Sequence, residues 1–218
     1  MKRLVKFTIL ALATAANAQT KDQASTTVPY SRALTHDKAE SWTYFKPGLD
    51  LRRYETITVD PTVVYQGSDA QFDDITPEDR EKYAQIVTTE LRQTLAKSFP
   101  ASAGTKQKTA RLRITLLGVD KTTGGVATAT RVTPFGFAVN AVKSMAGKPG
   151  RLTGSILYGA ELTDASTGEL QVGAVRRQSP DALDIPATFS TSDTVKAVAH
   201  DIAEDIRQKL LKATGRAN

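Results

Sequence analysis

Four arginines in two predicted strands have the spacing best suited to binding chemistry. Arg111 and Arg113 alternate with apolar residues, so both project from one face of their strand, while Arg176 and Arg177 end a second strand. If the two strands are neighbours, these guanidinium groups gather on an uncovered sheet face. Their planar geometry suits phosphate and carboxylate groups. The alternative is an ordinary solvated face, on which arginine is common.

Three acids precede the first long predicted helix and could form a carboxylate pair for acid–base catalysis or calcium binding. They are Asp60, Asp73 and Asp74. Acids at such positions commonly cap helices or solvate loops. We favour that interpretation and assign no catalytic residue.

The sequence offers little for metal or cofactor chemistry. His36 and His200 are the only histidines, and there is no cysteine. Metal sites need three or four converging ligands. His200 has three acidic neighbours, Asp201, Glu204 and Asp205, but the helical pattern puts them on a solvated face. We therefore predict no metal and no cofactor.

Two short motifs resemble catalytic or nucleotide-binding signatures without completing them. Ser155 follows a glycine but lacks the second glycine of a nucleophile elbow. Gly147-Lys148 lacks both the first glycine and the hydroxyl residue of a phosphate loop. We predict neither a serine hydrolase nor a nucleotide site.

Residues 134–146 predict a short helix that could contact a partner. Phe135 and Phe137 lie at its start and Lys143 is its one cation. The segment could lie in a membrane interface, pack on the core, or fit a groove of a partner protein. Its polar face is only weakly basic, so core packing is the simplest interpretation.

The first residues predict an export signal. Residues 1–6 are basic, residues 7–15 are almost wholly apolar, and Ala16-Asn17-Ala18 fits a signal-peptidase site. We expect cleavage after Ala18 and a periplasmic or secreted protein. The apolar run is far shorter than the ~20 residues of a membrane span, so we expect no transmembrane segment in the mature chain. Gln19 would then come first, where a lipoprotein needs cysteine.

The charge balance argues against a nucleic-acid partner. The chain has 29 basic and 23 acidic residues, and three of the basic residues lie in the leader, which leaves a net charge of +3. Nucleic-acid binders normally concentrate a much stronger basic patch.

The order of patterns predicts one α+β domain over residues 42–215 after a flexible tether at 19–41. A two-layer arrangement would bury every apolar stripe, with one mostly antiparallel sheet of four or more strands and long helices packed on one face. The predicted strands cover 54–65, 110–120, 152–163 and 169–177, and the predicted helices cover 76–98, 134–146 and 191–213.

Several runs together resemble a bacterial envelope family known only as domain of unknown function 3313. They are Tyr44-Phe45-Lys46-Pro47-Gly48-Leu49-Asp50, Ile57-Thr58-Val59-Asp60-Pro61, Thr76-Pro77-Glu78-Asp79, the segment from Pro134 to Lys148, and Leu162-Thr163-Asp164-Ala165-Ser166-Thr167-Gly168-Glu169. The resemblance covers about residues 42 to 213. It implies an envelope location, often through a lipid anchor whose cysteine is missing here, and it implies no activity. The element order is also similar to small sheet-and-helix domains of envelope assembly proteins, by fold analogy alone.

We therefore expect an exported, non-enzymatic protein that binds another envelope component. The contact would use the open sheet face or the 134–146 helix, and the partner would be an envelope protein or an anionic envelope component, with peripheral membrane contact as an option. Two alternatives remain. One is a hydrolase-like enzyme using the acids, and the other is a module for anionic lipid, lipopolysaccharide or peptidoglycan.

Overall fold

The computed structural model of the protein describes residues 28–38, 41–72, 74–99, 108–122, 153–180 and 190–216. The predicted signal peptide, the first part of the predicted tether and the predicted 134–146 helix lie outside these residues.

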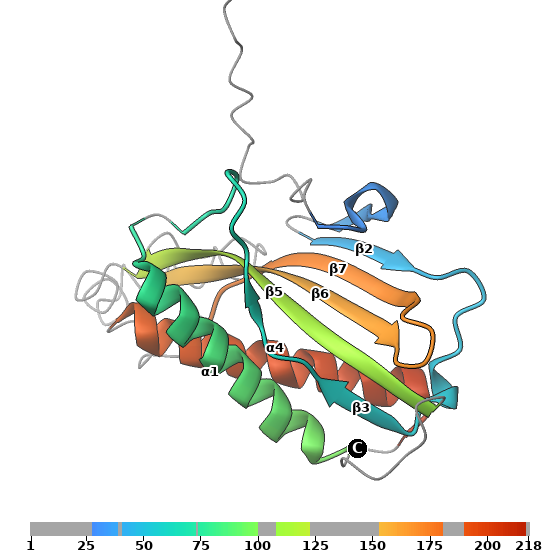
Figure 1. Ribbon diagram of the computed structural model, residues 1–218. Helices are drawn as coiled ribbons and strands as arrows, with labels where there is room; N and C mark the ends of the chain where they lie inside the picture. The colour runs from blue at the N-terminus through green and yellow to red at the C-terminus, as the bar shows by residue number, and fades with distance from the viewer. Residues whose placement is uncertain are drawn as a thin grey trace, which may run out of the picture.

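One mixed sheet organises the described chain (Figure 1). Its strand order is β1-β2-β7-β6-β5-β3, and β4 pairs with β5 beyond the end of β3. The strands are β1 (Thr35–Lys38), β2 (Ser41–Phe45), β3 (Thr56–Val59), β4 (Val63–Val64), β5 (Thr109–Thr122), β6 (Thr153–Asp164) and β7 (Leu170–Gln178).

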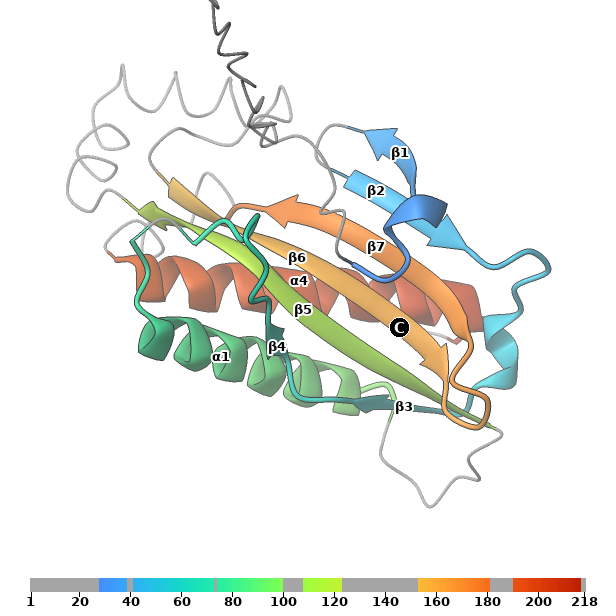
Figure 2. The same ribbon diagram turned by 45° about the horizontal axis from the view of Figure 1, so that its top comes forward.

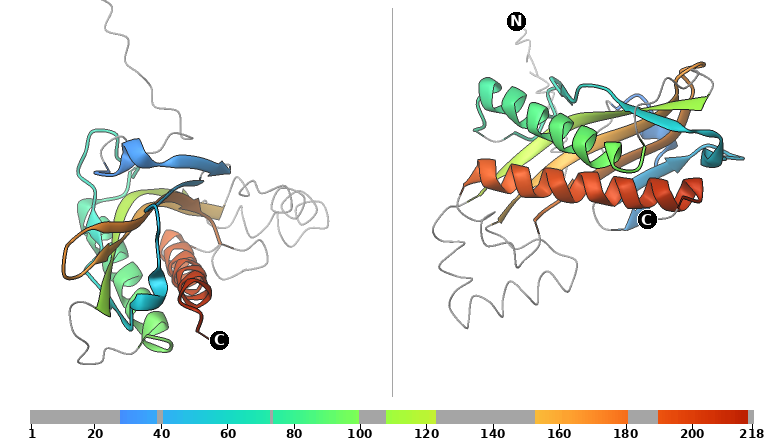
Figure 3. Two further views of the ribbon diagram at one scale, coloured as in Figure 1. Left: turned by 90° about the vertical axis from the view of Figure 1, so that its right-hand side faces the viewer. Right: turned by 90° about the horizontal axis from the view of Figure 1, so that it is seen from below.

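Two long helices cover the same face of this sheet, as Figures 2 and 3 show. Helix α1 (Pro77–Ala96) lies against β3 and β4, and helix α4 (Thr191–Thr214) lies against β5 and β6 and packs on α1. Two short 3₁₀ turns each precede a strand: η1 (Ser31–Ala33) precedes β1, and η2 (Leu51–Arg53) precedes β3. The helices contact mainly β3, β4, β5 and β6, so β7 and β2, toward the other edge of the sheet, are less covered by α4.

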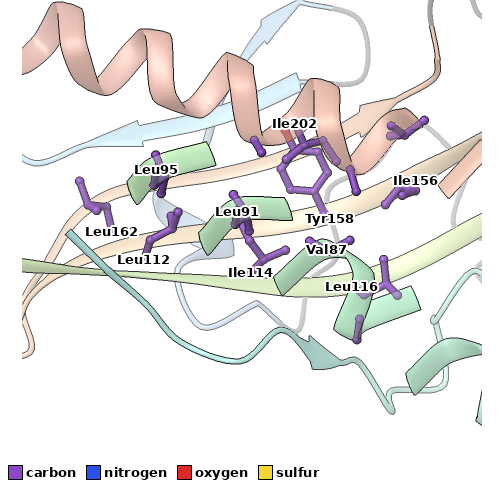
Figure 4. Close-up of a cluster of buried hydrophobic side chains, with 14 of the residues drawn as sticks. Val87, Leu91, Leu95, Leu112, Ile114, Leu116, Ile156, Tyr158, Leu162 and Ile202 are labelled. Atoms are coloured by element: carbon purple, nitrogen blue, oxygen red, sulfur yellow. The ribbon is translucent and has the colours of Figure 1, made fainter. Parts of the chain in front are cut away.

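The core forms where the alternating face of β5 meets the apolar stripes of the helices. Leu112, Ile114 and Leu116 are buried from β5, and Leu91 and Leu95 are buried from α1 (Figure 4). Burying a side chain of this kind contributes about 2 kcal/mol. This face therefore fixes the register of β5 and the position of both helices.

The predicted α+β architecture, with long helices on one face of a sheet, is confirmed, but the sheet is mixed. Among the described strands, β3 and β4 run parallel to β5, and the remaining pairings are antiparallel. The parallel pairing follows from the connection, since β3 and β4 reach β5 through the crossover helix α1. Pro61 separates β3 from β4, as expected for a residue that cannot donate to a ladder.

Part of the predicted tether lies on the sheet instead. Residues 28–38 contain η1 and β1, and Val28 and Tyr30 are buried against the face opposite the helices. The sequence suggested a tether because this stretch is polar overall. Two apolar side chains are enough to dock it.

None of the helices in the described part of the chain has the length and apolar composition that crossing a bilayer requires.

Candidate binding groove

The structure places Arg111 and Arg113 on the face opposite the helices, as their alternation predicted, and each faces an acid. Arg111 Nη2 lies 2.7 Å from Asp60 Oδ2, and Arg113 Nε lies 3.8 Å from the same oxygen. Both arginine side chains are about half exposed, whereas Asp60 is mostly buried. Asp60 therefore acts here as a partner for two cations.

Arg177 lies on the same face but far along the strand, in a buried polar network. Its side chain is 4% exposed. Its Nη1 lies 2.9 Å from Asp120 Oδ2 and 3.1 Å from Ser155 Oγ, and its Nη2 donates to Gln71 Oε1 at 2.6 Å. Ser155 Oγ donates in turn to Asp120. This serine is a member of a structural network, in keeping with its incomplete nucleophile motif.

Arg176 points to the opposite face, toward the helices, because neighbouring residues of a strand alternate. Its Nη1 lies 3.4 Å from Asp205 of α4. The four arginines are therefore not brought together. Arg111 pairs in register with Thr163 of β6, while Arg177 pairs with Leu157, six residues away or roughly 20 Å along the strand.

Of the three acids, Asp60 and Asp74 are described and lie far apart, whereas Asp73 lies outside the described residues. Phe135, Phe137 and Lys143 lie outside the described residues. Asp74 is 91% exposed beside Lys121. Asp60 N donates to the carbonyl oxygen of Leu112 in β5, whereas Asp74 lies beside Lys121, near the other end of the same strand. Asp60 and Asp74 therefore lie roughly 30 Å apart along the strand.

The histidines also stand apart from any ligand set. His36 packs on the ring of Trp42, and His200 Nδ1 lies 3.5 Å from Glu90. Within the described ranges, no three His, Cys, Asp or Glu side chains are placed to hold a metal ion.

A groove beside α4 is the concave feature that the sequence did not indicate. It lies where β7 and β2 are less covered by the helix, and its cavity volume is about 150 Å³. Phe45, at one wall, is 61% exposed. Ten of its fifteen lining residues are apolar: Phe45, Leu51, Leu112, Ala160, Leu162, Val172, Ala174, Ile206, Leu210 and Ala213.

Small side chains produce the hollow. Ala160 and Ala174 are paired across β6 and β7 and form the floor, while Ile206 and Leu210 form the wall on α4. Larger residues at the two alanines would meet the helix and fill the space. The groove is thus the part of the sheet–helix interface that side chains do not fill.

Charged groups lie at one end of this groove. Arg176 and Lys209 both pair with Asp205, so two cations share one carboxylate. Arg176 Nε is buried and finds no hydrogen-bond partner among the described residues. Burial raises the pKa of the nearby Tyr158 phenol, and Arg176 opposes this rise.

Sequence reasoning missed the groove because its signals resemble ordinary core. The apolar stripe of α4 that includes Ile206 and Leu210 has the spacing of any helix that packs on a core. The available signal was the pair of alanines at facing positions of a predicted hairpin, where a closed core would carry larger residues.

Comparison with known proteins identifies the family but no role. No curated protein matches the chain. A PelC dodecamer from Paraburkholderia phytofirmans is 13% identical, covers 81% of this chain and 99% of its own, and gives a TM-score of 0.37. A DUF4136 family protein from Bacteroides thetaiotaomicron is 10% identical, covers 82% of this chain and 98% of its own, and gives a TM-score of 0.36. Similarities of this size carry no argument about function.

The family model described as protein of unknown function (DUF3313) matches residues 23–206, which is most of the chain. The resemblance in the sequence is therefore confirmed, and the protein belongs to the DUF3313 family.

Proposed function

We propose that the protein is an exported, non-enzymatic member of the cell envelope that binds another envelope component by holding an apolar group of it in the groove beside α4. The observation that carries this proposal is the apolar groove itself, with Phe45 left 61% exposed at its wall. A concave apolar surface with a few polar groups beside it is the default candidate for a binding site.

The groove is a better candidate than the arginine face suggested by the sequence. Arg111, Arg113 and Arg177 already have carboxylate partners, so an incoming anion would have to displace them. The docked segment 28–38 also covers part of that face. An apolar group can enter the groove without displacing any of these carboxylates.

Site-specific photocrosslinking in cells tests this function. A photoreactive side chain replaces Ala213, which is exposed and lines the groove, or its neighbour Lys212, which is exposed and does not. We expect a discrete adduct with an envelope component from position 213 and a much weaker one from position 212. Equal labelling at both positions, or none from 213, contradicts the proposed function.

Cell fractionation tests the export part separately. We expect mature protein beginning at Gln19 in the extracytoplasmic fraction, read by intact mass. Recovery of the full-length chain from the cytosol would exclude it.

A further inference from the structure

We propose that the groove binds one acyl chain of a free fatty acid, with its carboxylate held near Arg176 and Lys209. This inference rests on the proposed function, in that the groove must be a binding site. It names the chemical class of the ligand, and so narrows the anionic-lipid alternative that the sequence left open to a single acyl chain.

The walls suit a hydrocarbon chain better than a peptide. A peptide brings backbone N–H and C=O groups that need partners when buried. The strands under the groove cannot provide them, because β2 and β7 pair with each other from Ser41↔Arg176 to Phe45↔Val172. A hydrocarbon chain has no such requirement.

The lining is polar at one end and apolar along the rest. Arg176 and Asp205 define the charged end, and Val172 and Leu162 lie at the other. These ends are four residues apart on β7, roughly 13 Å by strand geometry. A molecule with a polar head and a single apolar tail has the same division.

The charge at the polar end favours an anionic head. Two cations and one acid leave an excess of one positive charge, and the Arg176 Nε–H is buried without a partner among the described residues. A carboxylate oxygen accepting from this N–H would satisfy it, and such charge-assisted hydrogen bonds are stronger than neutral ones.

The size favours a single chain with a small head. A cavity of about 150 Å³ lined by apolar side chains holds a group about as large as benzene. The rest of a tail would lie along the open groove against Phe45. This size leaves no room in the cavity for the second tail of a diacyl lipid.

Calorimetric titration of the mature chain with dodecanoate and dodecanol tests the inference. Both ligands are used below micelle-forming concentrations at pH 8, where the acid is ionised. We expect dodecanoate to bind about ten- to a hundredfold more tightly than dodecanol, as a charge-assisted contact implies. Arg176→Gln should remove this preference, while Lys212→Ala, which removes a cation of α4 outside the groove, should keep it.

Two blocking variants test the location. Ala174→Leu fills the floor and should abolish binding of both ligands. Ala213→Trp narrows the opening from an exposed position, so it remains informative if Ala174→Leu fails to fold. Binding that survives in a folded blocking variant overturns the inference.

The remaining outcomes separate this inference from the proposed function. Equal binding of dodecanol and dodecanoate refutes the anionic head but leaves an apolar binding groove. If the protein binds neither dodecanoate nor dodecanol, the fatty-acid assignment is refuted. It is also refuted if the protein floats with phosphatidylglycerol vesicles but does not bind dodecanoate. In both cases the adduct from position 213 still decides the proposed function independently.

Discussion

The ring of Tyr30 lies directly against the backbone of Gly173 on the sheet face opposite the helices. A Cβ added to Gly173 would lie 2.7 Å from Tyr30 Cδ2, closer than side chains tolerate. The Tyr30 hydroxyl lies 3.1 Å from the carbonyl oxygen of Ala160 and 3.2 Å from that of Ala174, to which it donates. Burial, and secondarily Glu161, raises the pKa of this phenol, so Tyr30 stays neutral. The contact fastens residues 28–38 to the domain.

Gly173→Ala should therefore detach the segment that Tyr30 holds. The added methyl group overlaps the ring, and overpacking of this kind costs about 1–3 kcal/mol. Elsewhere in a strand the same change would be stabilising, because glycine weakens strands. Hydrogen exchange should show faster exchange over 28–38, and the unfolding midpoint in urea should fall.

A double-mutant cycle provides the control. In a Tyr30→Ala background, Gly173→Ala should cost almost nothing, because the ring that it strikes is gone. Additive costs in the cycle would show that Gly173 is constrained by something other than Tyr30.

This contact also shows why the sequence predicted the domain better than its N-terminal attachment. Periodicity within one segment predicted α1 and β5, and the start of the helix predicted over 76–98 is confirmed by the bond from Asp79 N to Thr76 Oγ1. Tyr30 docks on residues 130 or more positions away. No local pattern encodes such a contact.

The groove beside α4 was harder still to predict, for two physical reasons. Strand alternation places Arg176 and Arg177 on opposite faces, so they could not both join one cluster. The groove depends on how much of the sheet α4 covers. The covered area is set by packing across the whole layer. The apolar stripe of Ile206 and Leu210 has the same sequence pattern whether it faces a filled core or an open groove.

Asp164 should make the stability of the domain sensitive to acid. Its side chain is 4% exposed, and its oxygens accept from Ser166, Thr167, Tyr54 and Arg53. These bonds, that of the Ser166 hydroxyl foremost, hold the pKa of Asp164 well below its ordinary value of 3.8. The carboxylate thus contributes stability that is fully present above about pH 4 and is lost as the pH falls toward the depressed pKa.

Asp164→Asn isolates this contribution. At pH 7 the variant should lose about 2–4 kcal/mol of unfolding free energy, because it breaks charge-assisted bonds at a buried site. The difference from wild type should shrink as the pH drops below 4, measured by urea unfolding. Other depressed acids, such as Glu204 with a pKa of about 2, titrate in both proteins and cancel. A difference that is constant from pH 7 to pH 3 would contradict the assignment.

Arg177 and Arg111 should differ sharply in their contribution to stability. Removing Arg177 leaves Asp120 and Gln71 without the buried guanidinium that joins them, so Arg177→Ala should cost about 2–4 kcal/mol. Arg111 forms a half-exposed pair with Asp60, and its removal should cost less than about 1 kcal/mol. Chemical denaturation of both variants makes the comparison, and similar losses would mean that burial is not what distinguishes them.

The start of α4 offers a last test, at the residue that caps it. The N-cap is Ser190, whose Oγ accepts from Asp193 N at 3.1 Å and donates to the Asp193 carboxylate at 2.7 Å. Ser190→Ala should therefore cost about 1 kcal/mol, the usual loss of an N-cap. Ser192→Ala, inside the first turn, should cost much less, since alanine is the better helix former there. Thermal unfolding of the two variants makes the comparison, and a larger loss at Ser192 would show that Ser190 is not the cap.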